Sequence, residues 1–125
     1  MERGSNILLG GIEYTLLLTT KATKEIAKRY GGLSNLGDKL MKSENMETAL
    51  DEIVWLITLL ANQGVMVQNL RNKNAQRELL TEDMVELLTS PADFVQYKDA
   101  IMEAMHKGTK RNVESEEDPK NAQVG

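Results

Sequence analysis

Two adjacent glycines, Gly10 and Gly11, separate two short runs in which apolar and polar residues alternate. A two-residue hairpin turn needs positive φ angles at both central positions, and glycine adopts such angles at little steric cost. The pair therefore predicts a β-hairpin over residues 6–19, in which Leu9 lies opposite Ile12 on one face. This hairpin fixes the start of any fold that the chain can adopt.

After the hairpin, apolar residues recur at the three- and four-residue spacings of amphipathic helices. Strands that precede helices, without strand–helix alternation, indicate an α+β fold and not a parallel sheet. The chain has 125 residues, which fits one domain. We therefore expect a single α+β domain over residues 1–108, with the N-terminal hairpin packed on about five helices. The longer helices are expected over residues 20–30, 46–62 and 91–107, and shorter ones begin near Ser34 and Thr81.

Side chains that accept hydrogen bonds from free backbone N–H groups predict where the helices start. Thr20 or Thr23 is expected to cap the first helix, and Asn45 the longest one. Ser90, followed by a proline and an aspartate, is a strong start for the last helix.

Glycines predict where the helices end. Gly31 suits the left-handed residue that follows many helices, and Gly108 is expected to stop the last one. Gly64 is expected to break or kink the longest helix, because glycine in a helix interior costs about 1 kcal/mol relative to alanine. Residues 109–125 are polar and acidic, and we expect this tail to be disordered.

Composition narrows the class of protein. The chain has no cysteine, which excludes disulfides and thiolate metal sites and suits a cytoplasmic protein. Its formal charge of -4 gives no general attraction to DNA or to anionic membranes. The N-terminus is polar, and the densest apolar run, residues 53–61, is shorter than the roughly 18 residues of a membrane span. We expect a soluble protein.

One segment comes close to the phosphate-binding loop G-x-x-x-x-G-K-S/T. Gly32 and Gly37 have the required spacing, and Lys39 follows closely. However, Asp38 takes the place of the lysine, where its carboxylate would repel phosphates, and a helix precedes the glycines instead of a strand. We interpret these glycines as corners between helices.

The residues offer no catalytic or metal-binding constellation. His106 is the only histidine, and it falls near the end of a helix, where a partly positive imidazole favours the helix dipole. Without cysteine or a second histidine, a zinc site would be mostly carboxylate, which is uncommon. No neighbouring residue completes a nucleophile–base pair. We therefore expect no enzymatic activity, no cofactor and no bound metal.

A basic helix supports an alternative function. Lys21, Lys24, Lys28 and Arg29 lie within one expected helix, with Glu25 among them. A small regulatory or nucleic-acid-binding protein could use this Lys21–Arg29 helix, although exposed aromatic residues are lacking nearby. Salt-sensitive binding to duplex DNA would favour this alternative.

The segment IEYTLLLTTKATKEIAKRYGGLSNLGDKL, residues 12–40, is similar to a known family. It resembles the tail assembly chaperones of long-tailed phages and prophages of Gram-positive bacteria. Those proteins begin with a hairpin of the form G-x-E-Y-x-L-x-L-T-T-x-A, then a helix that ends in Tyr-Gly, then a longer hydrophobic helix. The resemblance covers about residues 7–108. The matching positions here are Gly11, Glu13, Tyr14, Leu16, Leu18, Thr19, Thr20, Ala22, Glu25, Tyr30 and Gly31.

The resemblance implies a non-enzymatic protein of the bacterial host cytoplasm that is absent from the mature virion. Such a chaperone holds the long tape measure protein soluble until tail-tube subunits polymerise around it. The implied partners are the tape measure protein and further copies of the chain, with the tail-tube protein as another candidate and no membrane. Family members are commonly also made as a longer, frameshifted form.

The family pattern supplies no site residues, so candidates for a client or self-association surface come from apolar positions late in the chain. Most apolar residues on helices are buried, so a position in the core is the alternative for each candidate. Flexible methionines such as Met66, Met84, Met102 and Met105 suit an adaptable binding surface. The candidate surface residues are Val65, Met66, Val67, Leu87 and Leu88.

Overall fold

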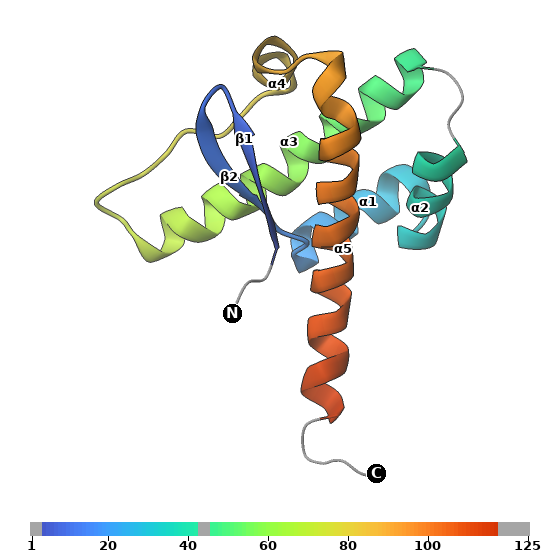
Figure 1. Cartoon of the computed structure of the whole chain (residues 1–125). Coiled ribbons are helices and arrows are strands. Elements are labelled where there is room, and N and C mark those ends of the chain that lie inside the picture. Colours follow the sequence, from blue (N-terminus) through green and yellow to red (C-terminus); the bar gives the residue numbers. More distant parts are fainter. Residues whose placement is uncertain (1–3, 43–45, 118–125) are drawn as a thin grey trace.

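A computed structural model describes residues 4–42 and 46–117 of the chain. The N-terminal hairpin precedes the helices and packs on them, which confirms the α+β prediction (Figure 1). The described residues form two strands, five α-helices and one 3-10 turn. In chain order these are β1 (Ser5–Leu9), β2 (Ile12–Leu16), α1 (Thr20–Tyr30), α2 (Leu33–Lys42), α3 (Met46–Arg71), α4 (Glu82–Leu88), η1 (Pro91–Asp93) and α5 (Phe94–Glu117).

The hairpin has the predicted turn and register. Gly10 and Gly11 have φ angles of 58° and 82°, and Leu9 pairs with Ile12 across them. Leu9 is buried, but Ile12, expected on the same covered face, is about half exposed.

Helix α3 forms the centre of the hydrophobic core. Its residues Leu56, Ile57 and Leu60 are fully buried. The helix packs against β2 on one side and also contacts α4 and α5, and α5 crosses it steeply (Figure 1). Burial of each large aliphatic side chain contributes about 1.5–3 kcal/mol, so α3 is the main source of stability.

The prediction that Gly64 breaks this helix is wrong, because α3 runs without interruption from Met46 to Arg71. A Cβ atom added to Gly64 would lie 2.2 Å from the carbonyl oxygen of Thr15. One turn earlier, the carbonyl of Leu60 accepts a hydrogen bond of 3.1 Å from the N–H of Leu17. Glycine at position 64 therefore lets β2 lie directly against the helix.

The prediction that Gly108 stops the last helix is also wrong, because α5 continues to Glu117. A Cβ atom at Gly108 would lie 2.8 Å from the Cβ of Leu18. This glycine therefore allows close packing between α5 and the segment that follows β2. Residues 118–125 of the predicted disordered tail lie outside the described residues, as does the predicted Asn45 cap.

The cap of α1 differs by one residue from the prediction. Thr19, and not Thr20 or Thr23, is the N-cap, and its hydroxyl accepts a hydrogen bond of 3.0 Å from the N–H of Ala22. Gly31 ends the helix with a φ angle of 88°, as predicted. The predicted starts Thr81 and Ser90 are N-caps, of α4 and η1 respectively. The helix expected to begin near Ser34 starts one residue earlier, at Leu33.

Candidate functional site

The structure separates the five candidate surface residues. Val65 is only 2% exposed and belongs to the core, which corrects its choice as a contact residue. Because α3 continues through Gly64, Val65 falls on the same buried stripe as Ile57 and Ala61. Met66 and Val67 are partly buried and line two different grooves, whereas Leu87 and Leu88 are exposed on α4.

Met66 lines an apolar groove of about 570 Å³ at the C-terminal end of α3. Leu70, 76% exposed, and the half-exposed Leu79 complete its apolar walls. We call this site the α3-end groove. An exposed leucine next to a flexible methionine suits contact with an apolar partner surface. The polar residues of its rim are Asn69, Lys73 and Gln76.

Two asparagine side chains of α3 hold the loop that forms one wall of this groove. The side chain of Asn62 donates to the carbonyl of Leu80 at 2.8 Å and accepts from its N–H at 2.7 Å. Asn69, two helical turns later, makes the same pair of bonds with Arg77, both at 3.0 Å. Each amide thus satisfies both backbone groups of one loop residue. The segment from Arg77 to Leu80 is thereby fixed along the helix.

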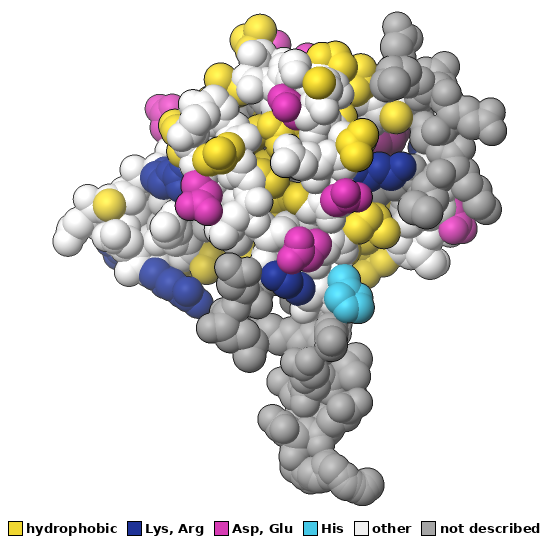
Figure 2. Space-filling view, viewed as in Figure 1, with side chains coloured by type: hydrophobic (Ala, Val, Ile, Leu, Met, Phe, Trp, Pro, Cys, Tyr) yellow, Lys and Arg dark blue, Asp and Glu magenta, His cyan; other side chains and the backbone are white. Residues whose placement is uncertain are grey.

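A second apolar surface joins the hairpin tip to α4. The side chain of Leu88 contacts Gly10, where an added Cβ would lie 2.8 Å from a methyl carbon of Leu88. Leu8, 63% exposed, lines the same depression, and the neighbouring Leu87 is 77% exposed. We call Leu8, Leu87 and Leu88 the hairpin–α4 surface. Figure 2 shows apolar side chains in several patches on this face of the molecule, separated by acidic and polar ones.

A polar groove of about 380 Å³ lies between β2 and the C-terminal half of α3, and we call it the β2 groove. Arg71 and Arg77 both line it, and Glu13 supplies one carboxylate. The guanidinium carbon of Arg77 lies 4.6 Å from the centre of the Tyr14 ring. Its Nη1 also donates to the side-chain oxygen of Gln68 at 3.3 Å. Arg77 is therefore held in position along this groove.

The basic residues of α1 do not all face solvent as free charges. Arg29 lies over the ring of Trp55, 4.5 Å from its centre, and 3.6 Å from the carboxylate of Glu52. It therefore takes part in the contact between α1 and α3. Glu25 lies 3.8 Å from Lys28, which offsets part of the remaining positive charge.

The residues that the sequence raised as candidates for metal or phosphate binding have structural positions instead. In residues 4–42 and 46–117, no three histidine, aspartate or glutamate side chains lie together as a metal site would need. His106 is exposed on α5, where Figure 2 shows a histidine at the surface. Gly32 precedes α2, but Gly37 lies inside it, so the interpretation as a helix corner is right only for Gly32.

Tyr97 connects α5 to β1 and makes the stability depend on pH. Its hydroxyl donates to the carbonyl of Leu8 at 3.1 Å. Burial raises the pKa of Tyr97 above its usual 10.0, and the carboxylate of Asp93 raises it further. Since the unfolded chain releases this proton first, the stabilisation is present below pH 10 and is lost as the pH rises through the folded-state pKa.

We therefore expect the free energy of unfolding to fall as the pH rises above 10, and to fall less in Tyr97→Phe. Urea denaturation at several pH values, followed by the fluorescence of Trp55, the only tryptophan, measures how the free energy of unfolding changes with pH in each protein. Equal slopes in the two proteins would contradict the role assigned to Tyr97.

Within the part of the chain that the structure describes, one helix is long and apolar enough to cross a membrane. The stretch Ala49–Arg71 in α3 has a mean hydropathy of 1.4. It is longer than the run 53–61 seen in the sequence because Gly64 does not end the helix. Half of the stretch is buried inside the fold, and core helices can meet the same criteria of length and composition.

Two residues of the α3-end groove were not among the sequence candidates. Leu70 follows Gly64, beyond the expected end of the longest helix, and Leu79 falls in a segment without helical spacing. One signal was available for Leu79, because neighbouring residues of an extended segment point to opposite sides. The adjacent pair Leu79-Leu80 therefore predicts one outward leucine, and the structure shows that Leu80 is the buried one.

Comparison with protein-family models, with curated proteins and with solved structures finds no match for this chain.

Proposed function

We propose that this protein is a non-enzymatic tail assembly chaperone that holds the tape measure protein of a long-tailed phage or prophage soluble in the host cytoplasm. The observation that carries the proposal is the set of three leucines, Leu8, Leu70 and Leu87, each more than 60% exposed on regular secondary structure. Leu70 lies with Met66 and Leu79 in the α3-end groove, and Leu87 lies beside the exposed Leu88, so these leucines belong to apolar surfaces of the kind that mark contact with a partner. The resemblance of residues 12–40 to the chaperone family supports the tape measure protein as this partner.

The α3-end groove and the hairpin–α4 surface suit a client with repeated apolar helices. Each surface would bury a small apolar area. Since burial contributes about 25 cal/mol per Å² of apolar surface, each contact is weak. Many copies along one long client give a strong total attachment that remains reversible at each site. Tail-tube subunits can then displace the copies one at a time. The net charge of -4 keeps such an assembly soluble.

Co-expression with the large helix-rich protein encoded downstream tests the proposal. The wild-type chain is expected to raise the soluble fraction of that client several-fold, and the double variant Leu70→Asp, Leu87→Asp is expected to abolish the increase. Ala27→Asp with Ser34→Asp is the matched control, because it adds the same charge at exposed positions of α1 and α2. The control is expected to act like the wild type. A client that is equally insoluble with and without the wild-type chain rules the function out.

A further inference from the structure

The sheet has only two strands, so each has one edge without a neighbouring strand. In a two-residue hairpin, Leu9 and Ile12 exchange hydrogen bonds, and the pairs beyond them alternate between bonded and non-bonded. The backbone groups of Glu13 and Thr15 therefore point to the outer edge of β2. Leu17 comes two residues after Thr15, and its N–H donates to α3, so it also points to the outer edge, as this alternation requires.

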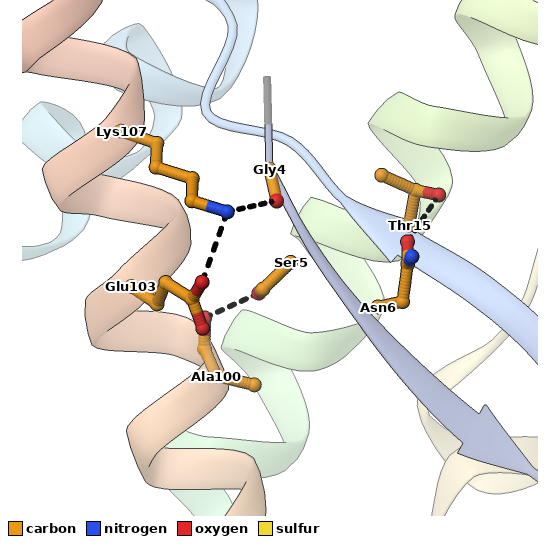
Figure 3. A network of polar contacts seen from close by, with 7 residues as sticks. All are labelled: Gly4, Ser5, Asn6, Thr15, Ala100, Glu103 and Lys107. Atoms are coloured by element: carbon orange, nitrogen blue, oxygen red, sulfur yellow. Dashed lines mark hydrogen bonds and ion pairs between the residues drawn. The ribbon is translucent and has the colours of Figure 1, made fainter. Parts of the chain in front are cut away.

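Helix α5 covers the corresponding edge of β1. Lys107 Nζ donates to the carbonyl of Gly4 at 3.1 Å, and the hydroxyl of Ser5 donates to the carbonyl of Ala100 at 2.6 Å (Figure 3). Tyr97 bonds the carbonyl of Leu8 further along the strand. Helix α5 thus lies along β1 and occupies the carbonyls of Gly4 and Leu8 at this edge.

The β2 edge is covered at one end only. Near Thr15 its carbonyl oxygen lies against Gly64 of α3. Toward the turn, the β2 groove opens beside Glu13 and Thr15. In this alternation Leu8 and Glu13 form a non-hydrogen-bonded pair, so the backbone N–H and C=O of Glu13 point away from β1 and toward the groove. An unpaired strand edge of this kind is a template for another extended chain.

The opposite wall of the groove carries positive charge. Arg71 and Arg77 line it, against the single carboxylate of Glu13. Guanidinium groups bind carboxylates through two parallel hydrogen bonds, and Arg77 is already oriented by the Tyr14 ring. A volume of about 380 Å³ holds a few residues of extended chain but not a helix, whose diameter with side chains is about 10 Å.

We propose that the β2 groove binds a short, extended, acidic segment of a partner protein, which adds to β2 as a third strand. The backbone of the segment pairs with the outward-pointing groups of Glu13, and an acidic side chain binds Arg71 and Arg77. The strand edge favours an extended backbone, and the two guanidinium groups favour an anionic side chain, which in an unmodified peptide is a carboxylate. This site is separate from the α3-end groove and the hairpin–α4 surface, and it does not depend on the proposed chaperone function.

Titration of the full-length, ¹⁵N-labelled protein with the blocked pentapeptide Val-Glu-Val-Glu-Val tests the site by NMR. Saturable shifts are expected at the amides of Glu13 and Thr15, and smaller ones at Leu8 on the covered edge. The same peptide with every backbone nitrogen methylated is expected not to bind, because it cannot pair with a strand edge. The peptide Val-Lys-Val-Lys-Val is expected to bind about tenfold more weakly, because it lacks the carboxylates.

Arg71→Glu is expected to weaken binding of the acidic peptide about tenfold. Arg71 is the exposed last residue of α3, so the fold does not depend on it. Lys24→Glu on α1 makes the same charge change away from the groove and is expected to bind like the wild type. Absence of saturable shifts, or shifts centred on Met66 and Leu70, would overturn the proposal. Equal binding of the methylated peptide or of inorganic phosphate would reduce the site to an anion site and also overturn strand addition.

Discussion

Replacing Gly64 with alanine is expected to destabilise the protein by about 2–3 kcal/mol, although alanine is the better helix former. The added Cβ atom would lie 2.2 Å from the carbonyl oxygen of Thr15 and 3.3 Å from its carbonyl carbon. Both are backbone atoms, so no side-chain rotation relieves the overlap, and β2 must move away from α3. That movement lengthens the bond between Leu17 and Leu60 and loosens the central contact of the core.

The matched control is Gly37→Ala. Gly37 lies inside α2, and an added Cβ atom there meets no atom within 4 Å. Here only helix propensity changes, and we expect a gain of about 0.5–1 kcal/mol. The two substitutions are chemically identical and are expected to have opposite signs.

Thermal denaturation measures both variants. At about 4 °C per kcal/mol, Gly64→Ala is expected to lower Tm by roughly 8–12 °C, and Gly37→Ala to raise it by a few degrees. A Gly64→Ala protein as stable as the wild type would show that the contact between β2 and α3 adjusts freely. The close approach would then contribute little to the fold.

The glycines also show which parts of the fold could be predicted from the sequence. The turn at Gly10 and Gly11 has a local cause, since both residues need positive φ angles, and the sequence predicts it with the correct register. Gly64 and Gly108 have a tertiary cause, because each one makes room for a distant segment. Nothing near them in the sequence indicates Thr15 or Leu18 as the neighbour. Local rules therefore predicted two helix ends that do not exist.

The wrongly predicted end of α3 also explains why Val65 was chosen as a surface residue. With α3 ended at residue 62, Val65 has no assigned helix face, and an exposed position is as acceptable as a buried one. Once the helix continues, its spacing from Ile57 and Ala61 places it in the core. The attachment of the loop after α3 through Asn62 and Asn69 depends on contacts that the spacing of residues does not reveal.

The C-terminal half of α3 supports both grooves. Met66 and Leu70 line the α3-end groove, whereas Val67 and Arg71 line the β2 groove. The loop contributes to both as well, with Leu79 in the first and Arg77 in the second. The contacts that fix this loop on α3 therefore position residues of both grooves.

Asn62→Ala is expected to destabilise the protein by about 2–3 kcal/mol. The substitution leaves the N–H and C=O of Leu80 without their partners beside a buried side chain, and each unsatisfied group costs roughly 1–3 kcal/mol. Asn62→Asp keeps the acceptor for the Leu80 N–H but loses the donor, so it is expected to lie between alanine and the wild type. Asn69→Ala acts at a more open part of the loop and is expected to cost about 1 kcal/mol.

Amide hydrogen exchange distinguishes loss of this local attachment from general destabilisation. In Asn62→Ala, protection of the Leu80 amide should fall more than that of Leu60 in the middle of α3. Since the released segment carries Leu79 and Arg77, the variant should also weaken both the solubilisation of the client and the binding of the acidic peptide. A variant with normal Leu80 protection would show that the loop keeps its place without the asparagine. If exchange is fast and both partners still bind fully, the grooves tolerate a mobile wall, and neither depends on the geometry of the loop.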